Sequence, residues 1–259
     1  MKQYIVDAFT DKVFSGNPAA VCILDEWLAD RLMQNIAIEN NFSETAFAVK
    51  EGNGYHIRWF TPGGEIDFCG HATLATAYTL FRFYEPDADK LIFNSMVGEL
   101  VITKNGDLIS MVFSAYELKH LEVTEDMISA LGEIPLAAYK DRDIMFVMRD
   151  EDSVKKLSPD MALLSKLDAV CIAVTARSSE YDCVSRVFAP SMGIDEDPVT
   201  GSTHCMIAPY WTKRLSKNEL TAFQASKRSG ILHIRVNGER VTVSGKAALF
   251  AISDILPKL

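Results

Sequence analysis

Residues 186–204 read Arg186-Val-Phe-Ala-Pro-Ser-Met-Gly-Ile-Asp-Glu-Asp-Pro-Val-Thr-Gly-Ser-Thr-His204. Three carboxylates, a proline and a Thr-Gly-Ser step come directly before residues 202–211, which carry no formal charge unless a histidine is protonated. This order is typical of a strand that leads into an acidic loop and then into a buried helix. The free backbone N–H groups at the start of such a helix would face whatever the loop holds.

An earlier stretch, residues 58–73, repeats this pattern. It reads Arg58-Trp-Phe-Thr-Pro-Gly-Gly-Glu-Ile-Asp-Phe-Cys-Gly-His-Ala-Thr73. The matches recur in order at offsets of 128, 131 and 132 residues: Phe60-Thr61-Pro62 with Phe188-Ala189-Pro190, Cys69-Gly70 with Thr200-Gly201, and Gly98 plus Asn105-Gly106 with Gly230 plus Asn237-Gly238. A repeat of half the chain predicts two similar domains related by a pseudo-two-fold axis, with both helix starts facing a shared cleft.

Composition and charge narrow the class of protein. A chain of 259 residues with 48% hydrophobic and 24% charged residues is typical of a soluble globular protein with a sizeable core. The net charge of −9 and the lack of a basic run argue against a nucleic-acid partner. No uncharged apolar run approaches the length of a membrane span, so no membrane partner is expected either.

The number and spacing of the cysteines indicate the redox state of the protein's compartment and whether a structural metal site is expected. There are five, an odd number, and none forms a CxxC pair or a Cys/His metal spacing. The sequence enters a strand pattern directly after its first residues, without the charged and apolar regions of a signal peptide. These features favour a reduced, cytoplasmic protein without a structural metal.

Hydrophobic patterning predicts strands interrupted by a few helices. Residues 27–39 have the spacing of an amphipathic helix, and residues 99–104 and 108–113 form a hairpin across Asn105-Gly106. Residues 70–81 contain no Asp, Glu, Lys or Arg, so a helix there must be covered on every face, and strands are expected to wrap around it. Pro209 falls inside the second such helix, which should be kinked or end early.

Four groups of residues resemble the phenazine-biosynthesis isomerase (PhzF-like) family, within the diaminopimelate epimerase-like fold superfamily. They are Asp7-Ala8-Phe9 with residues 16–21, Ser43-Glu44-Thr45, residues 58–62 with Cys69-Gly70-His71-Ala72-Thr73, and residues 195–202. The resemblance implies an α+β fold of two pseudo-symmetric domains, each a curved mixed sheet or barrel wrapped around a central helix. The expected domains are residues 1–115 and 116–259, with a C-terminal strand able to cross back to the first.

The resemblance also implies the catalytic residues. Glu44 matches the family's proton-transferring glutamate, and a dry cleft would bring its pKa toward the working pH. Asp197 matches the second active-site carboxylate, although N-capping of a helix is an alternative role. His71 stands at a helix start, where the helix dipole favours a neutral imidazole that can orient a carboxylate or substrate.

Substrate binding is expected from the groups around the two helix starts. Gly70, Gly201 and Ser202 would present backbone N–H groups to a substrate carboxylate, and Ser43 would add a hydroxyl. The same N–H groups would stabilise negative charge on the deprotonated substrate.

Cys69 and Thr200 separate two chemistries. The related racemases carry a thiol at both helix starts, whereas this chain has Cys69 at the first and Thr200 at the second. A threonine hydroxyl is too weakly acidic to exchange protons as a thiol does, which disfavours a two-thiol racemase. A one-thiol racemase- or dehydratase-like enzyme remains an alternative.

The function expected from the sequence is a cofactor-independent isomerase that moves a proton between carbons of a small carboxylate-bearing substrate. No phosphate-binding glycine fingerprint follows a strand, so no nicotinamide or ATP cofactor is expected. The phenazine enzyme's implied substrate is a dihydro-hydroxyanthranilate, but no motif assigns it to this chain. The fold is compatible with a homodimer, and a non-catalytic binding protein on the same scaffold is the alternative from another class.

Overall fold

The computed structural model describes residues 1–256 and divides the chain into two compact units. The first consists of Met1–Val112 together with Ser244–Leu259, and the second of Phe113–Val243. The chain therefore passes from one unit to the other twice. The last strand, β18 (Ala247–Asp254), belongs to the first unit because it pairs antiparallel with β1 (Lys2–Ala8).

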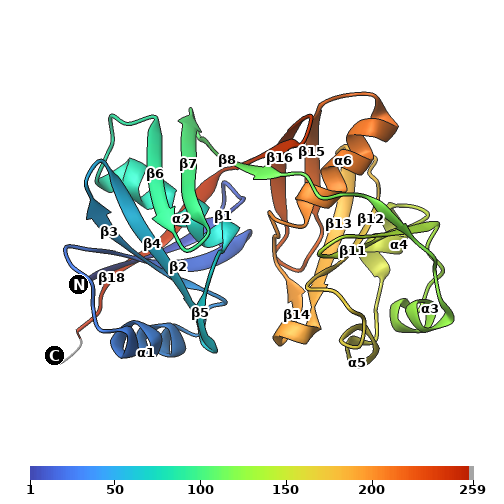
Figure 1. Ribbon diagram of the computed structural model, residues 1–259, viewed down its shortest axis with the longest axis horizontal. Coiled ribbons are helices and arrows are strands. Elements are labelled where there is room, and N and C mark those ends of the chain that lie inside the picture. Colours follow the sequence, from blue (N-terminus) through green and yellow to red (C-terminus); the bar gives the residue numbers. More distant parts are fainter. Residues whose placement is uncertain (257–259) are drawn as a thin grey trace. The chain divides into compact units, whose positions relative to one another are not determined.

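The first unit is a strongly bent mixed sheet with two helices (Figure 1). Its further elements are β2 (Asn17–Leu24), α1 (Asp30–Asn40), β3 (Thr45–Glu51), β4 (Gly54–Thr61), β5 (Gly64–Ile66), α2 (Gly70–Phe83), β6 (Lys90–Ser95), β7 (Gly98–Asn105) and β8 (Leu108–Ser114). The strands pair in the order β18-β1-β2-β3-β4-β6-β7-β8, and β5 adds to β4. The pairs β2–β3 and β4–β6 are parallel, and the other pairs are antiparallel.

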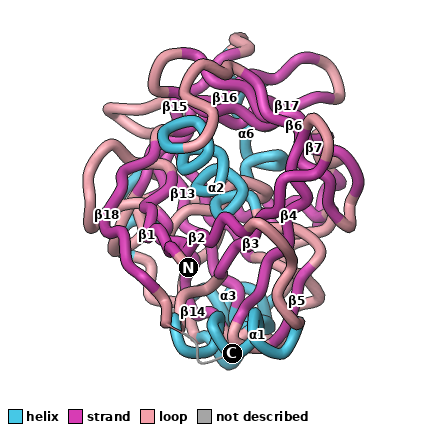
Figure 2. The backbone as a smooth tube through the Cα atoms, turned by 90° about the vertical axis from the view of Figure 1, so that its left-hand side faces the viewer, coloured by secondary structure: helices cyan, strands magenta, loops and turns pink. Residues whose placement is uncertain are grey.

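Helix α2 is the centre of the first unit, as its uncharged sequence predicts. Ten of its 14 residues are buried, on all sides of the helix. Figure 2 shows it enclosed by strands, which approach it from β1, β2, β3 and β18. Three threonines, Thr73, Thr76 and Thr79, are fully buried but donate their hydroxyls to carbonyls four residues earlier in the chain, so their polar groups are satisfied without a partner outside the helix.

Helix α1 covers the opposite face of the same sheet. Its buried residues Met33, Ile36 and Ala37 pack in one cluster with side chains of β2, β3 and β4. The middle of the sheet therefore lies between two helices, which explains why β2 and β3 are apolar at consecutive positions rather than alternating. The helix ends at Asn41, whose φ of 52° places it in the left-handed region that asparagine tolerates.

The second unit repeats this plan with more helices on its outer face. Its elements are β9 (Lys119–Leu121), α3 (Glu125–Leu131), β10 (Ala137–Lys140), β11 (Ile144–Val147), α4 (Glu151–Lys156), α5 (Met161–Leu164), β12 (Ile172–Arg177), β13 (Cys183–Ala189), the 3₁₀ turn Pro190–Met192, β14 (Ile194–Asp197), α6 (His204–Leu215), β15 (Glu219–Gln224), β16 (Gly230–Asn237) and β17 (Arg240–Gly245). Strands pair in the order β9-β10-β11-β12-β13-β15-β16, with β14 added to β13.

The internal repeat is visible in the connections. In the first unit α2 links the parallel strands β4 and β6, and in the second α6 links the parallel strands β13 and β15. Strands β7 and β16 are offset by 132 residues at both ends, and the glycines that follow them, Gly106 and Gly238, have φ values of 58° and 60°. The predicted α+β fold, with a curved mixed sheet around a central helix in each half, is confirmed.

Pro209 lies inside α6 without ending it. Of the two expected outcomes, a kink or an early end, the early end does not occur, because the helix continues to Leu215. A proline cannot donate to the carbonyl four residues earlier, a defect that ordinarily costs about 3 kcal/mol or more. Here that carbonyl, of Cys205, accepts instead from the backbone N–H of Tyr116 at 2.9 Å. A neighbouring segment thus supplies the hydrogen bond that the proline removes.

No helix within residues 1–256 has both the length and the apolar character needed to span a membrane. All five cysteines are buried and free of disulfides.

Candidate active site

Glu44 is fixed at the entrance of strand β3. The left-handed Asn41 ends α1 and turns the chain, and the Glu44 carbonyl then accepts from the N–H of Ala20 as the parallel pairing of β2 with β3 begins. The side chain of Asn40 supports the turn by donating to Thr45 and to Gln3. As a result the Glu44 carboxylate is held on a rigid element, with 11% of its side chain exposed.

The start of α2 supplies the other groups of the site. Cys69 is the N-cap residue in an extended conformation, its side chain does not cap the helix, and Gly70 and His71 form the first turn. A Cβ atom placed on Gly70 would meet only Phe68, at 3.9 Å, so the local fold does not require glycine there. The first turn carries no acidic side chain that would occupy its free N–H groups.

Glu44, Cys69 and His71 form a buried cluster. His71 Nε2 lies 3.1 Å from Glu44 Oε2, and His71 Nδ1 lies 3.4 Å from Cys69 Sγ. The imidazole therefore stands between a carboxylate and a thiol. The contact to Glu44 is close in distance but poorly aligned, because both atoms are buried without a hydrogen bond of good geometry in the described part of the chain.

The charges in this cluster stabilise one another. Burial raises the pKa of the Glu44 carboxyl, but the charge of His71 and hydrogen bonds from His71, Ser43 and Cys69 outweigh it, so the pKa ends below its usual value. Burial lowers the pKa of His71, yet Cys69 and Glu44 raise it well above the usual value. Burial and the Glu44 charge raise the pKa of the Cys69 thiol to about 11.

The protonation states differ from the sequence-based expectation in two respects. The pKa of His71 lies well above its usual value, which favours the imidazolium over the expected neutral imidazole, because the effect of burial is outweighed by Cys69 and Glu44. The pKa of Glu44 is lowered rather than raised, because the effect of burial is overcome by His71. The resting pair is thus carboxylate and imidazolium.

The same three side chains offer ligand atoms for a metal ion. One atom from each of Glu44, Cys69 and His71 lies within 4.8 Å of the others. Carboxylate, thiolate and imidazole together suit a borderline-soft cation such as Zn²⁺. Since the Cys69 pKa is about 11, such an ion would have to displace the thiol proton. The sequence did not predict this set, because Glu44 is far from the Cys69-Gly70-His71 motif in the chain.

The other expected site residues lie before α6 in the second unit. Thr200 donates its hydroxyl to Asp197 Oδ2 at 2.5 Å, and its backbone N–H donates to Gln224 Oε1 at 2.9 Å. Gln224 Nε2 in turn donates to the Asp197 carbonyl at 2.8 Å. Gly201 and Ser202 form the following turn, and the regular helix begins only at His204.

Three residues that support this turn were not predicted. Gln224 is fully buried, and His204 is buried with Nδ1 2.7 Å from the Thr200 carbonyl and Nε2 3.3 Å from the Ser185 hydroxyl. Burial lowers the pKa of His204 to about 4, so it is neutral. Asp143 is also fully buried and accepts from Thr203 Oγ1 and from the N–H of Cys171. Only their positions in space connect them with the turn, and no sequence pattern marks them.

Each helix start is preceded by a hairpin that an ion pair closes. In the first unit Arg58 of β4 holds Glu65 of β5 with two hydrogen bonds, at 2.6 and 2.7 Å. In the second unit Arg186 of β13 holds Glu196 of β14 in the same way, at 2.7 and 2.9 Å. The acidic loop expected before the second central helix therefore contains a short strand, β14, and Glu196 in it is paired with Arg186.

Comparison with known proteins agrees with this architecture. Residues 6–252 match the family described as phenazine biosynthesis-like protein (PhzC-PhzF). A Pseudomonas aeruginosa protein named as an uncharacterized isomerase is 48% identical, with 95% of each chain covered. The crystal structure of a PhzF-family protein from Enterococcus faecalis superposes with a TM-score of 0.97 at 47% identity, covering 99% of both chains.

A more distant structure shows the fold alone. A hydroxyproline epimerase from Agrobacterium vitis superposes with a TM-score of 0.64 at 9% identity, covering 98% of this chain and 90% of its own. The family match spans nearly the whole chain, and further relatives that it resembles closely are also named isomerases. The chain therefore belongs to the phenazine biosynthesis-like family and is an isomerase of that family.

Proposed function

We propose that the enzyme shifts a proton between two carbons of a small carboxylate-bearing molecule without a cofactor, and that Glu44 carries the proton. The observation that supports this most directly is the buried pair of Glu44 and His71, with Oε2 and Nε2 3.1 Å apart and poorly aligned. Because this contact is poorly aligned, a substrate C–H group can take the place of His71 next to the Glu44 carboxylate. Its position directly before β3 would hold it steady through both steps.

The proposed reaction has two proton transfers. The ionised Glu44 first removes a proton from a carbon conjugated with the substrate carboxylate, and the electron pair left behind delocalises toward that carboxylate. The protonated Glu44 then returns the proton to a different carbon, which restores the enzyme. Its lowered pKa keeps Glu44 ionised for the first step and makes its acid form a strong donor for the second.

The remaining expected residues are proposed to bind and orient the substrate. Backbone N–H groups at Gly70, Gly201 and Ser202 would receive the carboxylate and stabilise charge that develops on it. Asp197 is proposed as the second active-site carboxylate, and Ser43 supports Glu44 through the hydrogen bond that lowers its pKa.

Thiol chemistry is the competing reaction. Its support is the contact of Cys69 with His71 at 3.4 Å. Two observations weigh against it. A thiol with a pKa of about 11 is almost entirely protonated at neutral pH, and Thr200, at the equivalent position of the second unit, donates its hydroxyl to Asp197.

The deciding experiment measures proton exchange and isomerisation by NMR in deuterated water, using a panel of small unsaturated and amino carboxylic acids. Four variants are compared with the wild type: Glu44→Gln, Cys69→Ala, Cys69→Ser and Glu39→Gln. Glu39 is an exposed carboxylate on α1 and serves as the matched control. Loss of a positioned acid–base group typically costs about 10²- to 10⁴-fold in rate.

We expect Glu44→Gln to lose the reaction by this factor, while Glu39→Gln and Cys69→Ser keep it. Loss in both Cys69 variants with a functional Glu44→Gln would overturn the proposal in favour of thiol chemistry. If the wild type shows neither proton exchange nor isomerisation with any compound of the panel, a binding protein on this scaffold would be favoured.

A further inference from the structure

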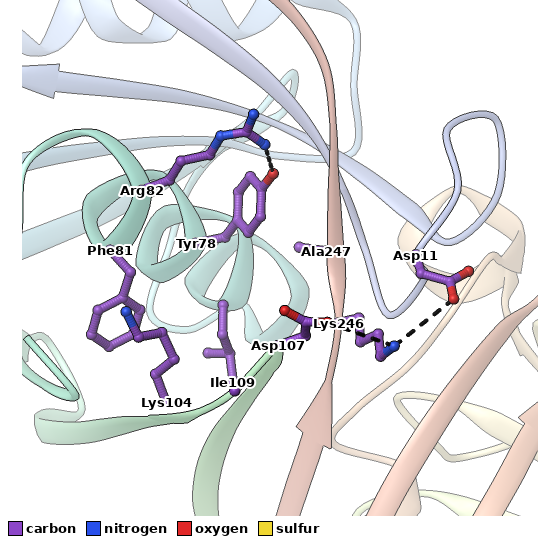
Figure 3. A pocket seen from close by; sticks show the side chains of 10 residues that line it. Asp11, Tyr78, Phe81, Arg82, Lys104, Asp107, Ile109, Lys246 and Ala247 are labelled. Carbon is purple, nitrogen blue, oxygen red and sulfur yellow. Dashed lines mark hydrogen bonds and ion pairs between the residues drawn. The ribbon is translucent and has the colours of Figure 1, made fainter. Parts of the chain in front are cut away.

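A pocket of about 450 Å³ opens on the first unit and contains no residue of the Glu44–Cys69–His71 cluster. Figure 3 shows its lining from three elements: Tyr78 and Phe81 of α2, Ile109 of β8, and Ala247 of β18. Phe81 and Ile109 are buried, and Tyr78 is half-buried. They give the pocket an apolar and partly aromatic floor.

The pocket lies beside the C-terminal half of α2, next to Ile109 of β8 and Ala247 of β18. Strand β8 pairs with β7, and β18 pairs with β1. A volume of this size falls in the range of sites for small organic ligands.

The charged groups around the opening are not balanced locally. Lys246 Nζ lies 4.0 Å from a carboxylate oxygen of Asp11 and of Asp107, so two acids share one cation. Arg82 and Lys104 also line the pocket, and neither makes an ion pair within residues 1–256. The lining thus carries three cations and two carboxylates, so its formal charge is opposite in sign to the net charge of −9 of the whole chain.

Aromatic rings hold these two cations at the pocket. Lys104 Nζ lies 4.8 Å from the centre of the Phe81 ring, and the Arg82 guanidinium lies 5.7 Å from the centre of the Tyr78 ring and bonds its hydroxyl. Arg82 lies in the last turn of α2, where its charge also offsets the helix dipole. This role does not explain why Lys104, on β7, lines the same pocket. Cations placed beside an apolar floor suit a ligand with an anionic group and a flat apolar body.

We propose that this pocket is a second ligand site, which binds a small aromatic anion through Arg82 and Lys104. The ring of the ligand lies on Tyr78, Phe81 and Ile109, and its phosphate or carboxylate lies at the cations. This site does not depend on the proposed reaction, because it shares no side chain with the catalytic cluster. Its occupant is a different molecule, or a second copy of the same class of molecule, bound along the side of α2.

The test is NMR of protein labelled at isoleucine δ1 methyl groups, because Ile109 reports from inside the pocket. The Ile109 signal is assigned from the spectrum of Ile109→Val. Phenyl phosphate is the probe, and inorganic phosphate and phenol separate the anionic part from the ring. The variants are Arg82→Gln with Lys104→Gln, and the control is Lys90→Gln, an exposed lysine on the neighbouring strand β6 that does not line the pocket.

We expect phenyl phosphate to shift the Ile109 methyl saturably, with affinity at least five times that of inorganic phosphate, and phenol to give no saturable shift. The double variant should weaken binding at least tenfold, as expected from the loss of charge-assisted contacts, while Lys90→Gln and Glu44→Gln bind as the wild type does. No Ile109 shift, equal binding of phenol, or unchanged affinity in the double variant would each overturn the proposal. A shift confined to other isoleucines would assign the anion to a different site.

Discussion

At the scale of single residues, the contact between Glu44 and His71 dominates the electrostatics of the first unit. The two groups are nearly excluded from water, so each would be unstable as an isolated charge. Together they are stable as carboxylate and imidazolium, and Cys69 adds a polar neighbour on the far side of the ring. The chemistry proposed for Glu44 depends on this balance, because removing His71 takes away the largest of the effects that lower the Glu44 pKa, while burial, which raises it, remains.

Stability should therefore depend on pH through this pair. His71 has a raised pKa in the folded state, so its contribution is complete below about 6.5 and is lost as the pH rises through the folded-state value. Glu44 has a lowered pKa, so its contribution is present above about 4.5 and is lost as the pH falls through its folded-state value. Both contributions are complete, and the pair stabilises the fold most, between about pH 4.5 and about pH 6.5.

Replacing His71 by Gln should lower the free energy of unfolding by about 3–5 kcal/mol near pH 6, because it leaves a buried carboxylate without its partner. The difference from the wild type should shrink toward acid pH, where Glu44 is protonated, and toward alkaline pH, where His71 is neutral. Urea unfolding measured from pH 4 to 9 gives this profile. His56→Gln is the control, because His56 pairs with Glu51 at an exposed position, and it should change the free energy by less than about 1 kcal/mol. Parallel wild-type and His71→Gln curves would contradict the ion-pair assignment.

At the scale of elements, the two hairpins that precede α2 and α6 are the same device. Arg58 and Arg186 each hold a glutamate with two hydrogen bonds, and each guanidinium also lies over a phenylalanine two residues later, at 5.1 and 5.0 Å from the ring centre. The side chains are largely buried, so these pairs are screened less than surface ones. The hairpins fix the chain just before the segments that carry the proposed site residues.

Glu65→Gln and Glu196→Gln should each destabilise their own hairpin by about 1–3 kcal/mol, the usual value of a charge-assisted hydrogen bond. Hydrogen exchange followed by mass spectrometry separates the two effects. Glu65→Gln should speed exchange in β4 and β5 and leave β13 and β14 unchanged, and Glu196→Gln should do the reverse. Each variant is the control of the other. Equal acceleration in both hairpins, or none, would show that the ion pairs do not act locally.

Local sequence patterns correctly predicted the helices and turns whose structure depends mainly on residues close to them in the chain. The absence of charge in residues 70–81 predicted a helix covered on every face, and the Asn-Gly pairs at 105–106 and 237–238 marked turns whose glycines adopt positive φ. Helix α4 was not expected, because it is a short polar helix that depends on the Asp150 side chain as its N-cap. Strand β14 was read as loop, because its pairing with β13 is a contact that local patterning does not encode.

The site shows the same limit. Motifs located Glu44 and His71, but the protonation of both depends on a distance that only the folded chain fixes. Asp143, His204 and Gln224 were missed for this reason. Each forms a hydrogen bond with a residue far along the chain, namely Thr203, Ser185 and Thr200, at separations of 60, 19 and 24 residues respectively.

At the scale of the whole molecule, the two units share a plan but differ in their titratable groups. The first unit places a carboxylate, a thiol and an imidazolium at the start of its central helix. At the matching place the second unit has Thr200 and a neutral His204, both engaged in hydrogen bonds that hold a turn. The repeat thus preserves the order of strand, hairpin and central helix, whereas the titratable side chains before and at the helix start differ between the units.

The path of the chain predicts that the two units differ in their ability to fold as isolated fragments. Residues Phe113–Val243 form the second unit from one continuous segment, whereas the first unit needs β18 from the end of the chain to pair with β1 along its whole length. A fragment of residues 113–243 should therefore fold alone and unfold cooperatively on heating. A fragment of residues 1–112 should not, because the edge of β1 is left unpaired and hydrophobic side chains in it are exposed. Joining residues 244–259 to it through a Gly-Ser linker should restore a cooperative transition. Circular dichroism on the three fragments tests this, and cooperative folding of residues 1–112 alone would show that β18 is an accessory strand rather than part of the first unit's core.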